Sequence, residues 1–163
     1  MEFRGREHLV VPGGADALRA GATGWIPLLA PWANRLSTRR FQLAGADVDL
    51  DGVDLSTDEN VLPVHGLLLG RAGWRVDHLS DDESDAQLQA SIEVDAAAFS
   101  LPHRIELTIV GRERALTIVT TAIPTGDRPV PIAFGWHPYR AKPIGTARST
   151  TSTRSPTSAS CPS

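Results

Sequence analysis

The feature of this sequence that most constrains its fold is a strict alternation of apolar and polar residues. Residues 88–94 alternate over their whole length, residues 105–109 repeat the pattern, and residues 116–123 are rich in β-branched side chains. Side chains of a strand point to alternate faces, so this period of two places the apolar set on one face of a sheet. No apolar repeat of 3.6 residues is sustained over about a dozen residues, so long helices are not expected.

Turn-forming segments separate these runs and complete the prediction of an all-β chain. A hairpin is predicted around residues 44–47, with Gly45 at its turn, and polar residues at 80–85, 111–114 and 127–131 predict later turns and loops. Short strands separated by turns indicate an antiparallel sandwich or barrel rather than a βαβ fold. The predicted strands are residues 41–43, 48–50, 74–79, 88–94, 105–109, 116–123 and 132–136.

Composition and charge exclude several classes of protein. The net charge is only −3, and no basic stripe carries interleaved aromatic residues, so a nucleic-acid partner is not expected. No apolar run approaches the roughly 20 residues of a membrane span, and the N-terminus lacks the apolar core of a signal peptide. Cys161 is the only cysteine, which excludes an intrachain disulfide and a thiolate metal site and favours a cytoplasmic protein.

The C-terminal stretch differs from the rest of the chain. From residue 145 onward Ser and Thr predominate, and almost no apolar residue is available for burial. Such a segment cannot offset the entropy lost on ordering. We therefore predict a β-rich domain at residues 1–140, followed by a disordered Ser/Thr-rich tail at residues 141–163.

Three segments carry polar and aromatic residues that a plain β-sandwich does not need. They are PWANRL at residues 31–36, VHG at 64–66 and FGWHPY at 134–139. Taken singly, each has a structural explanation. Asn34 can cap a turn, His65 can be a hydrogen-bonded structural histidine, and the last segment can be a packed strand end.

The remaining histidines lack such surroundings. His8, His78 and His103 each stand apart from the three segments. We expect all three to be surface or half-buried strand residues without a catalytic role.

Taken together and in this order, PWANR, HG and GWHPY make the chain resemble the aldose 1-epimerase (galactose mutarotase) family over residues 21–139. The resemblance implies an antiparallel β-sandwich of the galactose mutarotase-like type, here incomplete. It also implies an isomerase of hexose metabolism that interconverts the α and β anomers of free aldoses such as galactose or glucose. No cofactor and no metal are implied.

The resemblance also implies roles for individual residues. By match to GWHPY, His137 is the general acid that protonates the ring oxygen, a role that suits histidine because it exchanges protons near neutral pH. By match to HG, His65 takes part in catalysis by hydrogen-bonding the sugar near that oxygen. By match to PWANR, Arg35 binds sugar hydroxyls and Asn34 shapes the binding loop. Either of two aromatic residues can face the pyranose ring, namely Trp136 and Tyr139.

The resemblance is incomplete in one respect that matters for catalysis. The family's glutamate base and a sugar-binding aspartate lie downstream of HPY, and residues 140–163 contain neither Asp nor Glu. We therefore expect a fragment that is truncated at the C-terminus, with a frameshift near Arg140 as the hypothesis, and shortened at the N-terminus. Three alternatives remain open: an impaired enzyme, a non-catalytic carbohydrate-binding domain, and a non-functional fragment. A phosphorylated sugar also stays open, since Arg39 and Arg40 follow PWANR.

Overall fold

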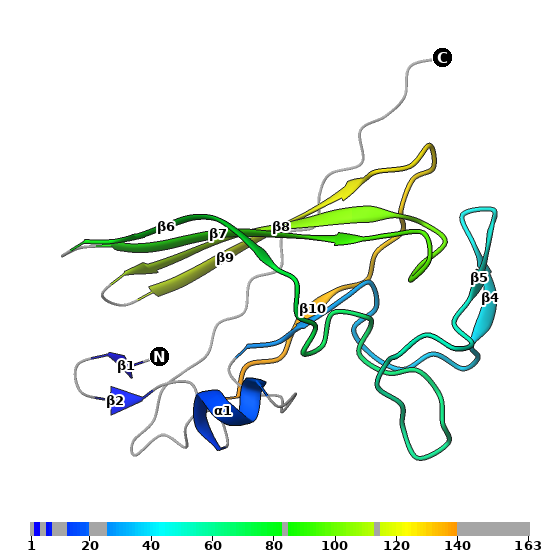
Figure 1. Ribbon diagram of the computed structural model, residues 1–163, viewed down its shortest axis with the longest axis horizontal. Helices are drawn as coiled ribbons and strands as arrows, with labels where there is room; N and C mark the ends of the chain where they lie inside the picture. Colours follow the sequence, from blue (N-terminus) through cyan, green and yellow to red (C-terminus); the bar gives the residue numbers. More distant parts are fainter. Residues whose placement is uncertain are drawn as a thin grey trace.

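In a computed structural model, the regular secondary structure of the protein consists almost entirely of antiparallel β-strands (Figure 1). The expected all-β class is confirmed. The only helix among the described residues is α1 at Gly14–Arg19, and no helix in that part of the chain is long and apolar enough to cross a membrane. Near the N-terminus, β1 at Glu2–Phe3 pairs with β2 at Arg6–Glu7. The structure describes residues 2–3, 6–7, 13–19, 26–82, 85–112 and 115–139. Outside them lie His8, the predicted tail at 141–163, and residues 83–84 and 113–114 of the predicted turns.

The largest part of the fold is a four-stranded sheet with the strand order β6-β7-β8-β9. Its strands are β6 at Arg75–Asp81, β7 at Asp85–Val94, β8 at His103–Arg112 and β9 at Ala115–Pro124. The last three have 10 residues each and are longer than predicted. The added residues at their ends continue the backbone ladder although the apolar alternation has stopped, and that alternation cannot reveal such extensions.

The alternation along β7 decides which face of this sheet meets the core. Ala90, Ile92 and Val94 are 6%, 4% and 0% exposed, as the period of two predicts. Ser91 points to the other face, where its hydroxyl donates a hydrogen bond of 2.8 Å to Oδ2 of Asp77 on β6. The sheet therefore has one face in the core and one face with polar cross-strand contacts.

The predicted hairpin is also present. It is formed by β4 at Arg40–Leu43 and β5 at Ala46–Asp49, which pair in antiparallel register. The turn consists of Ala44 and Gly45 alone and is shorter than predicted. Their φ values are 50° and 72°, in the left-handed region that two-residue turns matching the strand twist require.

A shorter pair joins two distant parts of the chain. β3 at Leu28–Leu29 pairs with β10 at Gly135–Trp136 in antiparallel register. The strand predicted over residues 132–136 is thus realised only in its last two residues. Two residues before Gly135, Ala133 forms an isolated bridge with Trp32.

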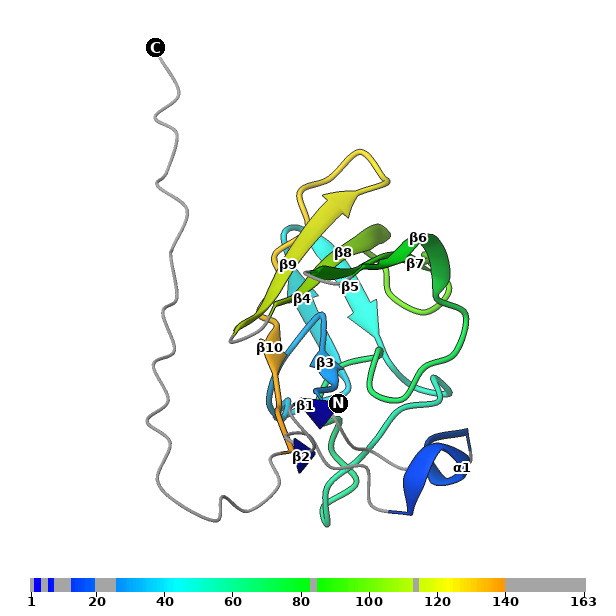
Figure 2. The same ribbon diagram turned by 90° about the vertical axis from the view of Figure 1, so that its left-hand side faces the viewer.

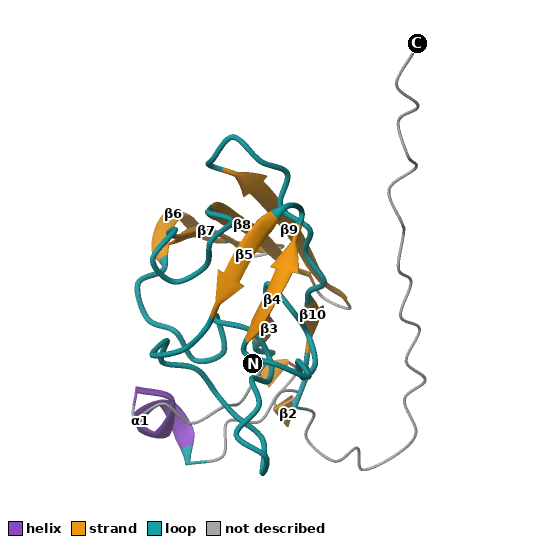
Figure 3. Cartoon of the chain, turned by 90° about the vertical axis from the view of Figure 1, so that its right-hand side faces the viewer, coloured by secondary structure: helices purple, strands orange, loops and turns teal. Residues whose placement is uncertain are grey.

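The hydrophobic core lies between the four-stranded sheet and a second layer made by β3, β10 and the β4–β5 hairpin (Figures 2 and 3). Leu50 follows the hairpin and Ile105 lies in the sheet, and both are 0% exposed. Phe99 comes from the loop between β7 and β8, and its ring centroid is 6.3 Å from that of Trp32. The core therefore fixes the segment that contains Trp32 against the sheet.

His103 lies inside this core, which corrects the expectation of a surface or half-buried residue. It is the first residue of β8, pairs with Val94 and is 0% exposed. Its Nδ1 is 2.9 Å from the carbonyl oxygen of Leu101, and its Nε2 has no hydrogen-bond partner among the described residues. Burial lowers the pKa of His103, against smaller opposing effects of the Leu101 carbonyl and the charge of Glu93.

We expect the free energy of unfolding to fall as the pH drops below about 6.5, the ordinary pKa of histidine in an unfolded chain. Because the folded pKa of His103 is lowered, the unfolded chain binds the proton first, so the stability present above this pH is lost below it. Urea unfolding at about pH 8 and about pH 5.5 measures the loss, which His103→Leu should reduce. His78→Gln, at an exposed histidine, is the control. An unchanged pH dependence in His103→Leu contradicts the assignment.

Candidate functional site

The PWANR segment runs from the core to the surface. Ala30 and Trp32 are 0% and 8% exposed and belong to the core cluster. After the half-buried Ala33, Asn34 and Arg35 are exposed. The segment therefore presents an amide and a guanidinium on a backbone that the buried Trp32 holds in place.

The HG segment lies against PWANR. The backbone N–H of His65 donates to the carbonyl of Asn34 at 3.0 Å, and its Nδ1 is 3.3 Å from the carbonyl oxygen of Ala33. A carbonyl oxygen can only accept, so this contact places the proton of a neutral imidazole on Nδ1. The Nε2 of this half-buried ring is then the nitrogen that can accept a hydrogen bond from a hydroxyl group.

The backbone around His65 explains why glycine follows it. The φ values of His65 and Gly66 are 66° and 76°. A Cβ atom at Gly66 would overlap the carbonyl oxygen of Ala30, so the close approach of the two segments requires glycine. The same carbonyl accepts hydrogen bonds from the N–H groups of Leu67 and Leu68 at 2.7 and 3.2 Å. These contacts hold His65 beside PWANR.

Trp136, in the third segment, is part of the framework. It pairs with Leu28 in the β3–β10 pair and packs against the hydrophobic core. Its Nε1 donates to Oγ1 of Thr120 on β9 at 3.1 Å. The indole therefore links β10 to the four-stranded sheet.

His137 follows Trp136 and is exposed. Its backbone N–H donates to the carbonyl of Pro27 at 3.1 Å, while its ring lies at the surface. The ring centroid of Tyr139 is 4.9 Å from that of His137, at an interplanar angle of 47°. The third segment thus presents an imidazole and a phenol ring next to each other.

The structure brings the three segments together around one stretch, residues 27–35. His137 is anchored at the start of this stretch and His65 near its end. In the part of the chain that the structure describes, no side-chain hydrogen bond or ion pair joins any two of the four predicted site residues. No group of three or more His, Cys, Asp or Glu among the described residues is placed to bind a metal ion.

Sequence reasoning missed one residue next to this site, Asp58. Its Oδ2 is 3.3 Å from Nε of Arg35. The Asp58 side chain is 4% exposed, whereas that of Arg35 is 56% exposed. The run Asp58-Glu-Asn60 is typical of a turn, and nothing in the sequence alone indicates that its first carboxylate faces an arginine.

The two arginines on which a phosphorylated substrate would depend are both ion-paired. Nε of Arg39 is 3.1 Å from Oδ1 of Asp51. Arg40 contacts Asp49 at 3.0 Å and Asp51 at 2.6 Å. These pairs connect the start of β4 to the end of β5, so the geometry gives no support to phosphate binding.

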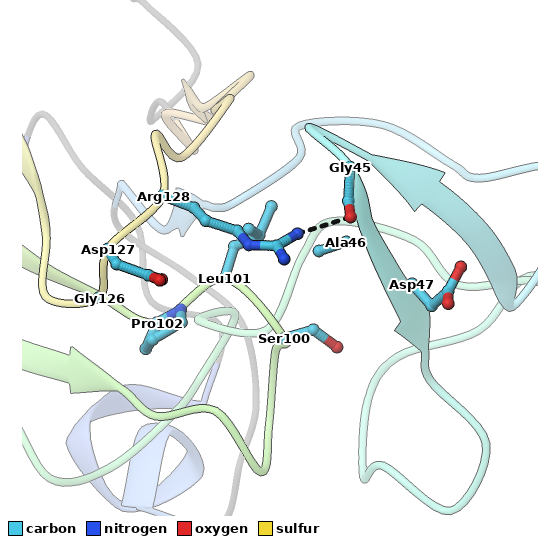
Figure 4. A pocket seen from close by; sticks show the side chains of 9 residues that line it. All are labelled: Gly45, Ala46, Asp47, Ser100, Leu101, Pro102, Gly126, Asp127 and Arg128. Carbon is cyan, nitrogen blue, oxygen red and sulfur yellow. Dashed lines mark hydrogen bonds between the residues drawn. The ribbon is translucent and has the colours of Figure 1, made fainter.

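A cleft of about 400 Å³ lies elsewhere in the molecule, among three loops (Figure 4). Nη1 of Arg128 donates to the carbonyl of Gly45 at 2.5 Å across it. None of the four predicted site residues lines this cleft, so they lie outside it. The lining residues are Gly45, Ala46, Asp47, Ser100, Leu101, Pro102, Gly126, Asp127 and Arg128.

Comparison with known proteins identifies the family of this chain. A family profile described as aldose 1-epimerase matches residues 8–143 and so includes all three segments. No curated protein and no solved structure matches the chain significantly. The match extends beyond both ends of the resemblance seen at residues 21–139 and covers most of the 163 residues. The chain belongs to the aldose 1-epimerase family, a family of isomerases that act on sugars.

Proposed function

We propose that this protein binds a free aldose, such as galactose or glucose, and assists the interconversion of its α and β anomers. The observation that supports this most directly is the hydrogen bonding of residues 64–66 and 133–137 to one stretch at residues 27–35. The segments that carry two imidazoles, a guanidinium and an amide are thereby attached to, or part of, one stretch of backbone. Family membership supports the general class of isomerase.

In the proposed reaction, ring opening needs two proton transfers. A base removes the proton of the C1 hydroxyl while an acid protonates the ring oxygen, and the bond between C1 and that oxygen breaks. Rotation about C1–C2 and reclosure with the reverse transfers give the other anomer. His137 is the proposed acid, and Nε2 of His65 hydrogen-bonds near the same oxygen. Arg35 donates to sugar hydroxyls, and Asn34 shapes the loop.

We assign no base in this chain. The family resemblance places a glutamate base after the HPY segment, and residues 140–163 contain neither Asp nor Glu. A positioned general base contributes about 10²–10⁴-fold to a rate. We therefore expect the 163-residue chain to bind sugar but to accelerate mutarotation only slightly.

Two measurements on the purified chain test this proposal. D-galactose or D-glucose should raise the thermal unfolding temperature, and Arg35→Ala should remove most of that rise. Polarimetry of α-D-galactose should show a relaxation only slightly faster than the spontaneous one, and His137→Ala should remove the remaining acceleration. His78→Ala, at an exposed histidine on β6, is the matched control.

Other outcomes have distinct meanings. A large acceleration that His137→Ala abolishes contradicts the expected impairment and establishes an active enzyme. Sugar-induced stabilisation with no acceleration favours the non-catalytic carbohydrate-binding domain. The absence of any stabilisation by either sugar refutes the binding proposal.

A further inference from the structure

The carboxylate of Asp58 is held rigidly by its own turn. Oδ1 accepts hydrogen bonds from the backbone N–H groups of Asn60 and Leu62, at 2.9 and 3.0 Å. The backbone N–H of Asp58 also donates to the carbonyl of Leu62 at 2.9 Å, and Thr57 forms a bridge with Pro63. This turn gives the side chain a single direction and leaves little room for another rotamer.

The second oxygen of the same carboxylate is buried and faces a cation. Oδ2 of Asp58 accepts no hydrogen bond from the described residues, and Nε of Arg35 lies 3.3 Å from it. The N–H of Leu62 is the main cause that lowers the pKa of Asp58, and the N–H of Asn60 and the charge of Arg35 add to it against burial. A charged oxygen that is buried in this way is costly without a nearby cation.

The two partners of this ion pair differ in freedom. Asp58 is 4% exposed and fixed, whereas Arg35 is 56% exposed and has a long side chain with many rotamers. Among the described residues, the guanidinium of Arg35 donates no hydrogen bond, and its one ion-pair partner is Asp58, which it contacts through Nε. The carboxylate therefore holds the guanidinium at its Nε side and leaves the two Nη groups for other partners.

From this geometry we propose that Asp58 is a positioning residue that orients the guanidinium of Arg35 so that its Nη groups face a bound sugar. The inference rests on the proposed sugar-binding role of Arg35. It assigns to Asp58 a part in substrate binding without contact with the substrate. A preformed orientation spares the rotamer entropy that Arg35 would otherwise lose on binding.

The competing explanation is that Asp58 only closes the turn at residues 57–63. Asp58→Asn separates the two roles. Its amide oxygen can still accept from the N–H groups of Asn60 and Leu62, which forces the NH2 group to the position of Oδ2. There the neutral NH2 group replaces the charged oxygen that lies 3.3 Å from Nε of Arg35. The turn is kept and the ion pair is lost.

We expect Asp58→Asn to weaken the affinity for D-galactose about tenfold, which corresponds to the loss of one interaction with a charged group. Titration followed by NMR measures this affinity, and the Nε–Hε signal of Arg35 in the same spectra should move toward that of free arginine. In an Arg35→Ala background, Asp58→Asn should have no further effect. Asp51→Asn is the matched control, because Asp51 pairs with Arg39 and Arg40 and not with Arg35.

Several outcomes overturn the proposal. One is an unchanged affinity in Asp58→Asn while Arg35→Ala still weakens binding, which leaves the proposed function intact. Another is an equal loss of sugar affinity on Asp58→Asn in the parent protein and in the Arg35→Ala variant, which indicates that Asp58 acts only through the turn. If Arg35→Ala itself binds sugar normally, the role of Arg35 is wrong and the inference fails with it. Should Asp58→Asn not fold, Asp58→Ser decides, because its hydroxyl can still accept a hydrogen bond from the backbone of the turn: an affinity equal to that of the parent protein contradicts the proposal.

Discussion

Replacing Gly66 by alanine is expected to lower the free energy of unfolding by about 3 kcal/mol or more, or to prevent folding. Two costs add at this position. The φ of 76° is unfavourable for any residue with a Cβ atom. The new Cβ would also overlap the carbonyl oxygen of Ala30, a backbone atom that cannot rotate away as a side chain can. Moving that carbonyl would break its hydrogen bonds to Leu67 and Leu68.

Gly52 offers a matched control for this experiment. Its φ is 77°, yet a Cβ atom there would meet nothing within 4 Å. Gly52→Ala should therefore cost about 1 kcal/mol, which is the backbone strain alone. In a chain of this size 1 kcal/mol corresponds to roughly 2–4 °C in the unfolding temperature, which thermal denaturation resolves easily. Equal losses in the two variants would falsify the close approach of HG to PWANR.

Phe99→Ala is expected to cost about 3–5 kcal/mol, the range typical of a fully buried aromatic residue. Phe99 is 2% exposed. Its ring packs near Trp32 and meets the ring of His103 edge-on, with centroids 5.9 Å apart. The substitution therefore opens a cavity between the sheet and the PWANR segment. Since native proteins are stable by only about 5–15 kcal/mol, this loss is a large share of the total.

Chemical denaturation with urea measures the effect, and two variants serve as controls. Phe99→Leu retains most of the apolar volume and should lose clearly less stability than Phe99→Ala. Val119→Ala removes apolar atoms from a side chain that is 53% exposed and should change stability by less than about 0.5 kcal/mol. A loss in Phe99→Ala no larger than that in Val119→Ala would show that Phe99 is not part of the core.

Much of the sheet could be predicted because its information is local. The alternation at residues 88–94 determines which side chains share a face, and the tight turn at Gly45 determines a hairpin. The burial of His103 could not be predicted in this way. It depends on pairing with Val94 and on the loop that brings Phe99 over it, and neither is visible in the alternation.

The sequence segments of the candidate site could be predicted, but their arrangement around one stretch of backbone could not. The segments with His65, His137 and Arg35 stood out in the sequence because polar and aromatic residues gather there. Their attachment to one stretch at residues 27–35 depends on strand pairing between distant segments. Asp58 could not be predicted as part of the site, because carboxylates are common in polar turns and only the fold places Arg35 beside this one.

The pairing of β3 with β10 has a consequence for how the protein folds. The hairpins of the meander from β6 to β9 join strands that are close in sequence. Leu28, in contrast, pairs with Trp136, which lies near the other end of the described chain. A contact between residues that are distant in sequence costs more loop-closure entropy, and this cost arises before the contact contributes to stability. We therefore expect the meander to form early and the candidate site to assemble last. During synthesis on the ribosome, a chain that has not yet exposed residues 135–137 contains the HG and PWANR segments but cannot complete the site.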